Sequence, residues 1–122
     1  MPQSILNSVK KVVGLAPDDP SFDLDILLHI NSVFATLNQL GIGRDEGFLI
    51  EDDGPTWEVF LGEDPRYNFV KSYVYLRVRL LFDPPGTSFV IQSYQEQIKE
   101  LEFRMSVLRE GEKWIDPTIP VV

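Results

Sequence analysis

The sequence feature that most constrains the fold is a forced chain reversal inside residues 67–109. Pro84 and Pro85 stand together between two long apolar-periodic runs, and Gly86 follows them. A proline lacks a backbone N–H and disfavours the α conformation in the residue before it, so a helix ends at this pair. We therefore predict a helical hairpin whose arms bring their apolar faces together. Neither arm carries a nucleophile, a metal-ligand cluster or a phosphate-binding loop, which indicates a packing or assembly module.

The same apolar periodicity predicts the other helices. Apolar residues recur at steps of three and four residues in four segments, at about 3–13, 22–40, 64–82 and 88–110. A short helical turn is predicted around Trp57, Phe60 and Leu61, whose side chains are expected to fill the core. A chain of 122 residues has the size of one domain. The predicted fold class is all-α, a small helical bundle of three long helices and a short N-terminal helix, in a single domain over 1–122.

The second predicted helix has the clearest sidedness, and Ser21 is placed to cap it. One row of side chains is apolar and is expected to face the core: Ile26, Ile30, Val33, Leu37 and Leu40. The opposite row is polar and is expected to face water: Asp25, His29, Ser32, Thr36 and Gln39. In the third helix, Lys71, Tyr75 and Arg79 form the row expected to be exposed. In the last helix, a seam for packing on another helix is predicted at Ile91, Tyr94, Ile98, Leu101, Met105 and Leu108.

Two segments interrupt this helical pattern. Residues 41–54 contain four glycines and form a long acidic loop between the second and third major segments, with a short strand expected at 48–50. Residues 111–122 contain Pro117 and Pro120 and are expected to form an extended C-terminal tail. The tail is rich in apolar side chains, which favours docking in a groove, either on its own domain or on a partner.

The net charge of −8 is concentrated in the middle of the chain. Residues 15–64 hold twelve acidic side chains against Arg44 alone, whereas residues 65–122 hold eight basic and seven acidic ones. Affinity for nucleic acid comes largely from neutralising phosphates with clustered lysine and arginine. Tight DNA binding is therefore not expected, although an acidic surface can work beside DNA by repelling it.

Chemistry-bearing motifs are weak in this sequence. His29, the single histidine, has only Asp25 one turn before it, which is too few ligands for a metal site. The glycines of 41–47 lack the Gly-Lys-Ser/Thr of a phosphate-binding loop, and the acids beside them do not have the spacing of a calcium loop. The chain has no cysteine, and no stretch is apolar for long enough to span a bilayer. We expect no enzyme activity, no cofactor, no metal and no membrane.

Three features are candidates for contacts between subunits. Arg77 lies among apolar helical neighbours and needs either an acidic partner, in Glu96, Glu100 or a neighbouring subunit, or an escape to solvent. Phe103 and Val107 lie away from the seam and form a second apolar patch. Asn31 and Asn38 flank the second helix, where they either bridge to a neighbouring helix or subunit or are simply solvated.

At the level of sequence strings, the chain resembles the head-tail connector, or adaptor, proteins of long-tailed bacteriophages and prophages. The resemblance covers about 5–110. It rests on Trp57, Phe60 and five strings: FDLDI at 22–26, HINSVF at 29–34, LNQLGIG at 37–43, VKSYVYLRVRLLFDPP at 70–85 and ELEFR at 100–104. These strings mark a scaffold and contain no catalytic site.

The resemblance implies a structural virion protein made in the cytoplasm of the bacterial host and located in the virion neck. Such proteins form a homo-oligomeric ring, usually dodecameric, below the portal protein. The ring joins phage head to tail, extends the DNA channel and meets a stopper or tail completion protein, while DNA passes through without specific binding. The alternative is a helical DNA-packaging or regulatory factor such as a small terminase-like subunit, which would need a basic recognition surface.

The resemblance also gives the two non-helical segments a use. The C-terminal segment of related adaptors reaches the portal, which implies a portal-binding tail at Trp114, Ile115, Pro117, Ile119, Pro120, Val121 and Val122. The acidic loop residues are expected to face either the channel lumen, where they keep DNA off the wall, or the stopper: Asp45, Glu46, Glu51, Asp52 and Asp53.

Overall fold

The computed structural model describes residues 3–43, 47–62 and 64–113, with side chains as far as Arg109. Its elements are α1 (Ile5–Val12), α2 (Asp23–Gln39), α3 (Trp57–Leu61), the 3₁₀ helix η1 (Pro65–Tyr67), α4 (Asn68–Phe82) and α5 (Ser88–Lys113). Over these residues no strand is formed, and the only β pairing is an isolated bridge between Ser4 and Thr56. The all-α fold class is therefore confirmed.

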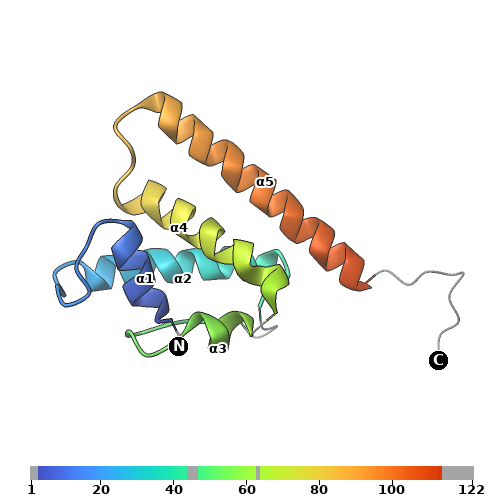
Figure 1. Ribbon diagram of the computed structural model, residues 1–122, viewed down its shortest axis with the longest axis horizontal. Coiled ribbons are helices and arrows are strands. Elements are labelled where there is room, and N and C mark those ends of the chain that lie inside the picture. The colour runs from blue at the N-terminus through green and yellow to red at the C-terminus, as the bar shows by residue number, and fades with distance from the viewer. Residues whose placement is uncertain (1–2, 44–46, 63, 114–122) are drawn as a thin grey trace, which may run out of the picture.

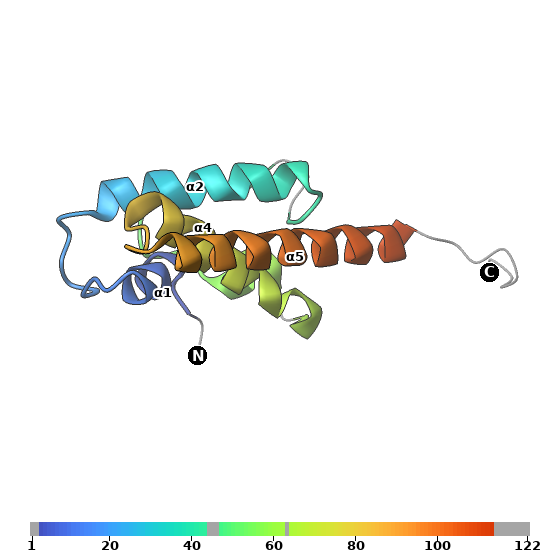
Figure 2. The ribbon, with the colours of Figure 1, turned by 90° about the horizontal axis from the view of Figure 1, so that it is seen from above.

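Helices α2 and α4 form the centre of the molecule, α1 packs against both, and α5 packs along α4 (Figure 1). The chain reverses between α4 and α5, as the proline pair predicts, so the two helices run in opposite directions (Figure 1). Seen from above, α2 and α1 lie on either side of α5 (Figure 2). Arg109 lies so close to Gly41 that a Cβ on that glycine would be 2.5 Å from the arginine Nε. Helix α5 thus extends as far as the end of α2.

Helix α1 lies within the segment 3–13 that the apolar periodicity predicts to be helical. The Ser4 Oγ accepts a hydrogen bond from the backbone N–H of Asn7 (3.2 Å), which satisfies one of the free donors of the first turn. Gly14 follows the helix with a φ of +87°, a conformation that glycine adopts without steric cost. Ile5 and Val9 are fully buried against the central helices.

A lysine in α1 is buried with its charge compensated. Lys10 is only 1% exposed, and its Nζ lies 2.7 Å from Oδ1 of Asp23 at the start of α2. The same Nζ donates to the carbonyl oxygens of Asp19 (2.7 Å) and Pro17 (3.1 Å) in the connecting segment. One ammonium group therefore joins α1, the linker and α2, which replaces the water that a buried charge loses.

The predicted cap of α2 at Ser21 is wrong. Phe22 occupies the capping position and makes no side-chain capping bond. The hydroxyl of Ser21 instead donates to Oδ1 of Asp19 (2.6 Å), and its backbone N–H donates to the same oxygen (3.0 Å). These two bonds, the hydroxyl's first, lower the pKa of Asp19. The side chain of Ser21 therefore stabilises the local turn instead of capping the helix.

The strand predicted at 48–50 is also wrong. Ile50 is buried, and its backbone pairs with a side chain: its N–H donates to Oδ1 of Asn31 and its carbonyl accepts from Nδ2, both at 2.9 Å. Because these bonds occupy both backbone groups, the residue needs no partner strand. Phe48 stacks on Phe60 with ring centroids 4.9 Å apart, which fixes the start of this loop segment to the core.

The short helix α3 plugs the core as predicted. Trp57 and Phe60 are buried, and the Trp57 indole N–H donates to Oγ of Ser8 (2.8 Å), a buried bond between α3 and α1. Tyr75 of α4 packs edge-on against Trp57, with ring centroids 5.8 Å apart. The exposed row predicted for α4 is therefore wrong: Lys71, Tyr75 and Arg79 are all only partly exposed, and the Tyr75 ring covers the indole. The first turn of the predicted 64–82 helix is the separate 3₁₀ helix η1.

Candidate assembly interface

The outer face of α5 exposes large apolar side chains. On the inner face Met105 is fully buried and Ile98 nearly so, which confirms that the predicted seam packs on the body. Phe103 is 68% exposed and Val107 53% exposed, and the helical repeat places both on the side opposite the seam. Phe89, at the start of α5, is exposed on the same side. We call Phe89, Phe103 and Val107 the outer face of α5.

Helix α2 carries a second exposed apolar surface, which the apolar periodicity of the sequence does not predict. The predicted core row is buried except at Leu40, which is partly buried, but the face directly opposite bears Leu24, 72% exposed, and Leu28, 61% exposed. The row expected to face water lies to one side of these leucines, and its His29 packs edge-on against Phe82 (ring centroids 6.5 Å apart). The row expected to face water is exposed at Asp25, Ser32 and Gln39 and partly buried at His29 and Thr36. We call Leu24 and Leu28 the α2 strip.

Arg77 has its acidic partner within the same chain. Its Nη1 lies 3.7 Å from Oε2 of Glu102 on α5 and donates to the hydroxyl of Tyr73 (3.4 Å). The hydroxyl of Tyr73 in turn donates to the same glutamate oxygen (2.8 Å). The predicted structural ion pair is present, but its partner is Glu102 instead of Glu96 or Glu100. The cluster stabilises the contact between α4 and α5.

Tyr73 makes the stability of the folded protein depend on pH in the alkaline range. Burial, first, and the hydrogen bond to Glu102 raise its pKa well above the usual value near 10. A raised folded-state pKa contributes stability that is complete below about pH 10 and is lost as the pH rises above it. We expect Tyr73→Phe to remove up to about 1.4 kcal/mol per pH unit from the alkaline slope of unfolding stability.

The measurement is urea unfolding at several pH values between 8 and 11.5. Tyr94→Phe is the matched control, because it also removes one tyrosine hydroxyl, from a half-buried position on α5. Equal alkaline slopes in the Tyr73→Phe, Tyr94→Phe and unmodified proteins would contradict the assignment.

The two flank asparagines differ in their surroundings. The amide of Asn31 is used within the chain, where it holds the backbone of Ile50 on both sides. Asn38 lines an open hollow of about 500 Å³ between α2 and the segment 47–49. Of the predicted subunit contacts, Arg77 and Asn31 therefore have intrachain roles, whereas Phe103 and Val107 are presented to the outside.

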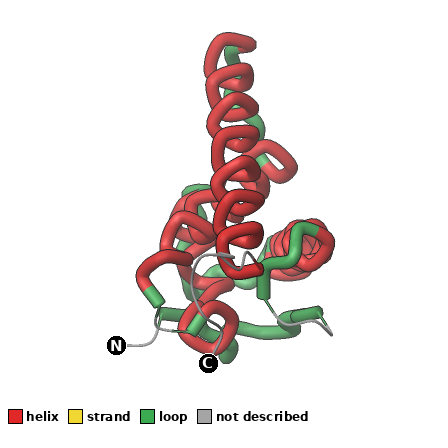
Figure 3. The backbone as a smooth tube through the Cα atoms, turned by 90° about the vertical axis from the view of Figure 1, so that its right-hand side faces the viewer, coloured by secondary structure: helices red, strands yellow, loops and turns green. Residues whose placement is uncertain are grey.

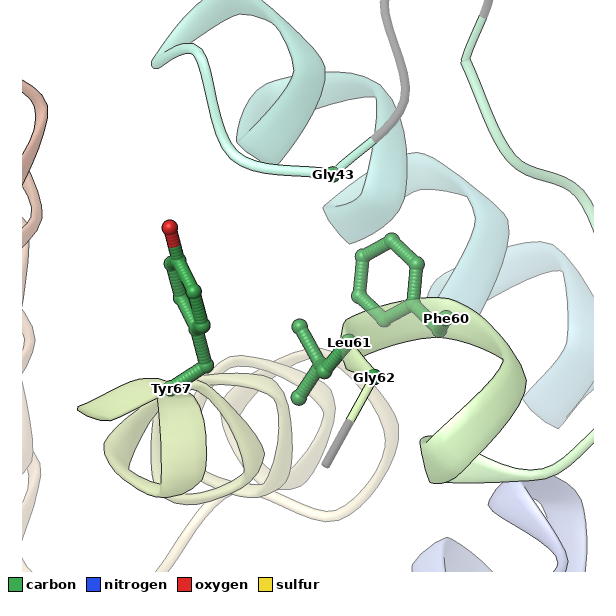
Figure 4. Close-up of a pocket in the computed structure, with 5 residues that line it drawn as sticks. All are labelled: Gly43, Phe60, Leu61, Gly62 and Tyr67. Atoms are coloured by element: carbon green, nitrogen blue, oxygen red, sulfur yellow. The ribbon is translucent and has the colours of Figure 1, made fainter. Parts of the chain in front are cut away.

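Two further hollows lie on the surface. One, of about 520 Å³, lies between α4 and α5 and is lined by Arg77, Leu80, Leu81, Gln95, Ile98, Lys99 and Glu102. The other, of about 290 Å³, lies beside the end of α3, where Leu61 and Tyr67 point into it below Gly43 (Figure 4). Across the described residues, no group of three or more histidine, aspartate or glutamate side chains is arranged to hold a metal ion.

The predicted loop and tail sites are described only in part. Glu51, Asp52 and Asp53 are exposed, and Oδ1 of Asp52 accepts from the N–H of Gly54 (2.8 Å). Asp45 and Glu46 lie outside the described residues, as does the whole predicted portal-binding tail: Trp114, Ile115, Pro117, Ile119, Pro120, Val121 and Val122. Among the helices that the structure describes, none is long and apolar enough to cross a membrane.

Comparison with known proteins identifies the family. A family model described as phage connector protein matches residues 5–112, which is most of the chain. No curated protein and no solved structure gives a significant match. The matched range includes the hairpin of α4 and α5 and both exposed apolar surfaces. The chain therefore belongs to the phage connector protein family, whose members have a structural role in joining parts of the phage particle.

Proposed function

We propose that the protein forms a ring below the portal of a phage head, where it joins head to tail and extends the DNA channel. The observation that carries the proposal is the outer face of α5, which presents Phe103 and Val107 to solvent in a chain of the connector family. A soluble monomer gains nothing from exposing such a patch, whereas a subunit interface buries it. The proposed role needs no catalytic group and no cofactor.

The charge distribution supports a channel that lets DNA slide. The exposed acids Glu51, Asp52 and Asp53 follow a segment that also contains Asp45 and Glu46. Carboxylates repel the phosphate backbone, so an acidic loop at the lumen keeps the duplex off the wall. The same loop is suited to meet a stopper or tail completion protein if it faces the next ring. We propose that the acidic loop faces either the channel lumen or the stopper.

The proposed partners are other copies of the chain, the portal protein and a stopper or tail completion protein. A dodecamer is the proposed copy number, following the resemblance to adaptor proteins. The apolar tail beginning at Trp114 is the proposed portal contact. The proposed place is the virion neck, reached after synthesis in the cytoplasm of the bacterial host.

Mass photometry of the purified protein with its phage's portal protein tests the proposal. We expect a complex heavier than the portal by many copies of the 14.0 kDa chain. A protein that stayed monomeric beside the portal would overturn the proposal. If that protein also shifted DNA at moderate salt, the alternative of a small terminase-like packaging factor would be supported.

A single substitution on the outer face tests self-association. We expect Val107→Asp to weaken each contact between subunits by about 10- to 100-fold, because a buried valine contributes about 1.5–3 kcal/mol. Mass photometry or sedimentation with portal measures the assembly. Val59→Asp on α3 is the matched control, since Val59 is 52% exposed and Val107 is 53% exposed. Equal assembly by the two variants would show that Val107 does not lie in the interface between subunits.

A further inference from the structure

Two exposed apolar ridges of the same spacing lie on different sides of the subunit. Leu24 and Leu28 are four residues apart on α2, and Phe103 and Val107 are four residues apart on α5. Viewed toward the C-terminal end of α5, that helix is at the top and α2 is at the right (Figure 3). Side chains four residues apart form the ridges that interdigitate in the commonest class of helix packing. Both ridges therefore have the spacing that this class of packing uses.

Among the described residues, an unpaired charge lies within one helical turn of each ridge, and the two charges are opposite in sign. Residues 15–43 contain four aspartates and no lysine or arginine, and the exposed Asp25 lies three residues before Leu28. On α5, Glu100 is paired with Arg104 and Glu102 with Arg77. Lys99, exposed and four residues before Phe103, is the unpaired cation one turn from this ridge, and the exposed Glu96 lies further along the helix, seven residues before Phe103. Within the part of the chain that the structure describes, neither Asp25 nor Lys99 takes part in an ion pair.

We propose that the α2 strip of one copy packs against the outer face of α5 of the next copy. The inference rests on the proposed ring and names its subunit contact. Because the two surfaces differ, the contact is heterologous: each copy uses its α2 strip toward one neighbour and its α5 face toward the other. Repetition of such a contact closes a ring when the rotation between neighbours divides a full turn, whereas a contact of one surface with itself would stop at a dimer. Asp25 and Lys99 then approach each other across the contact.

The chain has no cysteine, so engineered cysteines report this contact directly. The variants are Leu28→Cys and Phe103→Cys, mixed in equal amounts, assembled with portal and mildly oxidised. A disulfide forms only where the two Cβ atoms approach within about 4.5 Å. We expect the mixture to give a crosslinked dimer of the two variants, with at least about tenfold less from either variant alone. Gln97→Cys, exposed on another side of α5, replaces Phe103→Cys in the control mixture.

Each result decides between the inference and its alternatives. Crosslinking within Leu28→Cys alone or within Phe103→Cys alone, at the level of the mixture, would show a contact of one surface with itself and overturn the inference. Assembly without any crosslink above the control would overturn the inference and leave the proposed ring standing. If the unmodified protein forms no assembly with portal, the proposed function itself fails and the inference fails with it.

Discussion

Lys10→Ala is expected to lower the free energy of unfolding by about 2–4 kcal/mol. Removing one partner of a buried ion pair costs about 3–5 kcal/mol when both groups are buried, and we reduce the figure because Asp23 is 34% exposed. The substitution leaves the Asp23 carboxylate and the carbonyls of Pro17 and Asp19 without their donor. A loss of this size is a large part of the stability of an ordinary small domain.

Urea unfolding followed by circular dichroism measures this effect. Lys11→Ala is the matched control, because Lys11 is the next residue of α1 and its side chain is exposed. We expect Lys11→Ala to change the stability by less than about 0.5 kcal/mol. Lys10→Met keeps most of the apolar stem, so the free energy of unfolding that this variant loses is the contribution of the ammonium group. A Lys10→Ala variant as stable as Lys11→Ala would show that the buried pair contributes nothing.

The burial of Lys10 could have been predicted from its apolar neighbours on the helix. Its helical neighbours at four positions before and three positions after are Leu6 and Val13, both buried. The same argument predicts an acidic partner for Arg77 among apolar neighbours, and that partner exists. A cation inside an apolar row therefore predicts an ion pair, but the identity of the acid depends on packing. Glu102 was missed because helix spacing does not fix the register of α5 against α4.

Features set by local chemistry were predicted well. The proline pair fixes the reversal between α4 and α5, and the three- and four-residue steps of α5 fix its buried seam, with Met105 fully enclosed. The ion pair of Glu100 and Arg104, 2.8 Å apart, is equally local, since it joins residues four apart on one helix. These predictions need only neighbours along the chain.

Features set by distant contacts were not predictable in this way. Ile50 lies in an apolar run that is typical of a strand, but the side-chain amide of Asn31, nineteen residues earlier, takes its backbone bonds. Leu24 and Leu28 are apolar, and sequence alone gives no reason for them to lie outside the core. Their exposure depends on which surfaces of the bundle the other helices leave uncovered.

Deletion of residues 114–122 is expected to abolish attachment to the portal while the helical bundle stays folded. The segment contains Trp114, Ile115 and Ile119, and each large apolar side chain that becomes buried contributes about 1.5–3 kcal/mol to binding. Loss of three such groups weakens binding by at least about 1,000-fold. Helix α5 ends at Lys113, so the deletion removes none of the described helices.

Two measurements separate portal contact from folding. Mass photometry with portal detects attachment, and far-ultraviolet circular dichroism with thermal unfolding detects the bundle. A variant in which Glu51, Asp52 and Asp53 are replaced by asparagine and glutamine is the control, because it changes an exposed loop and should keep portal attachment. If the deletion variant lost its helical signal or its cooperative unfolding, the tail would belong to the protein's own core. If it still bound portal as the full chain does, the contact would lie elsewhere on the subunit.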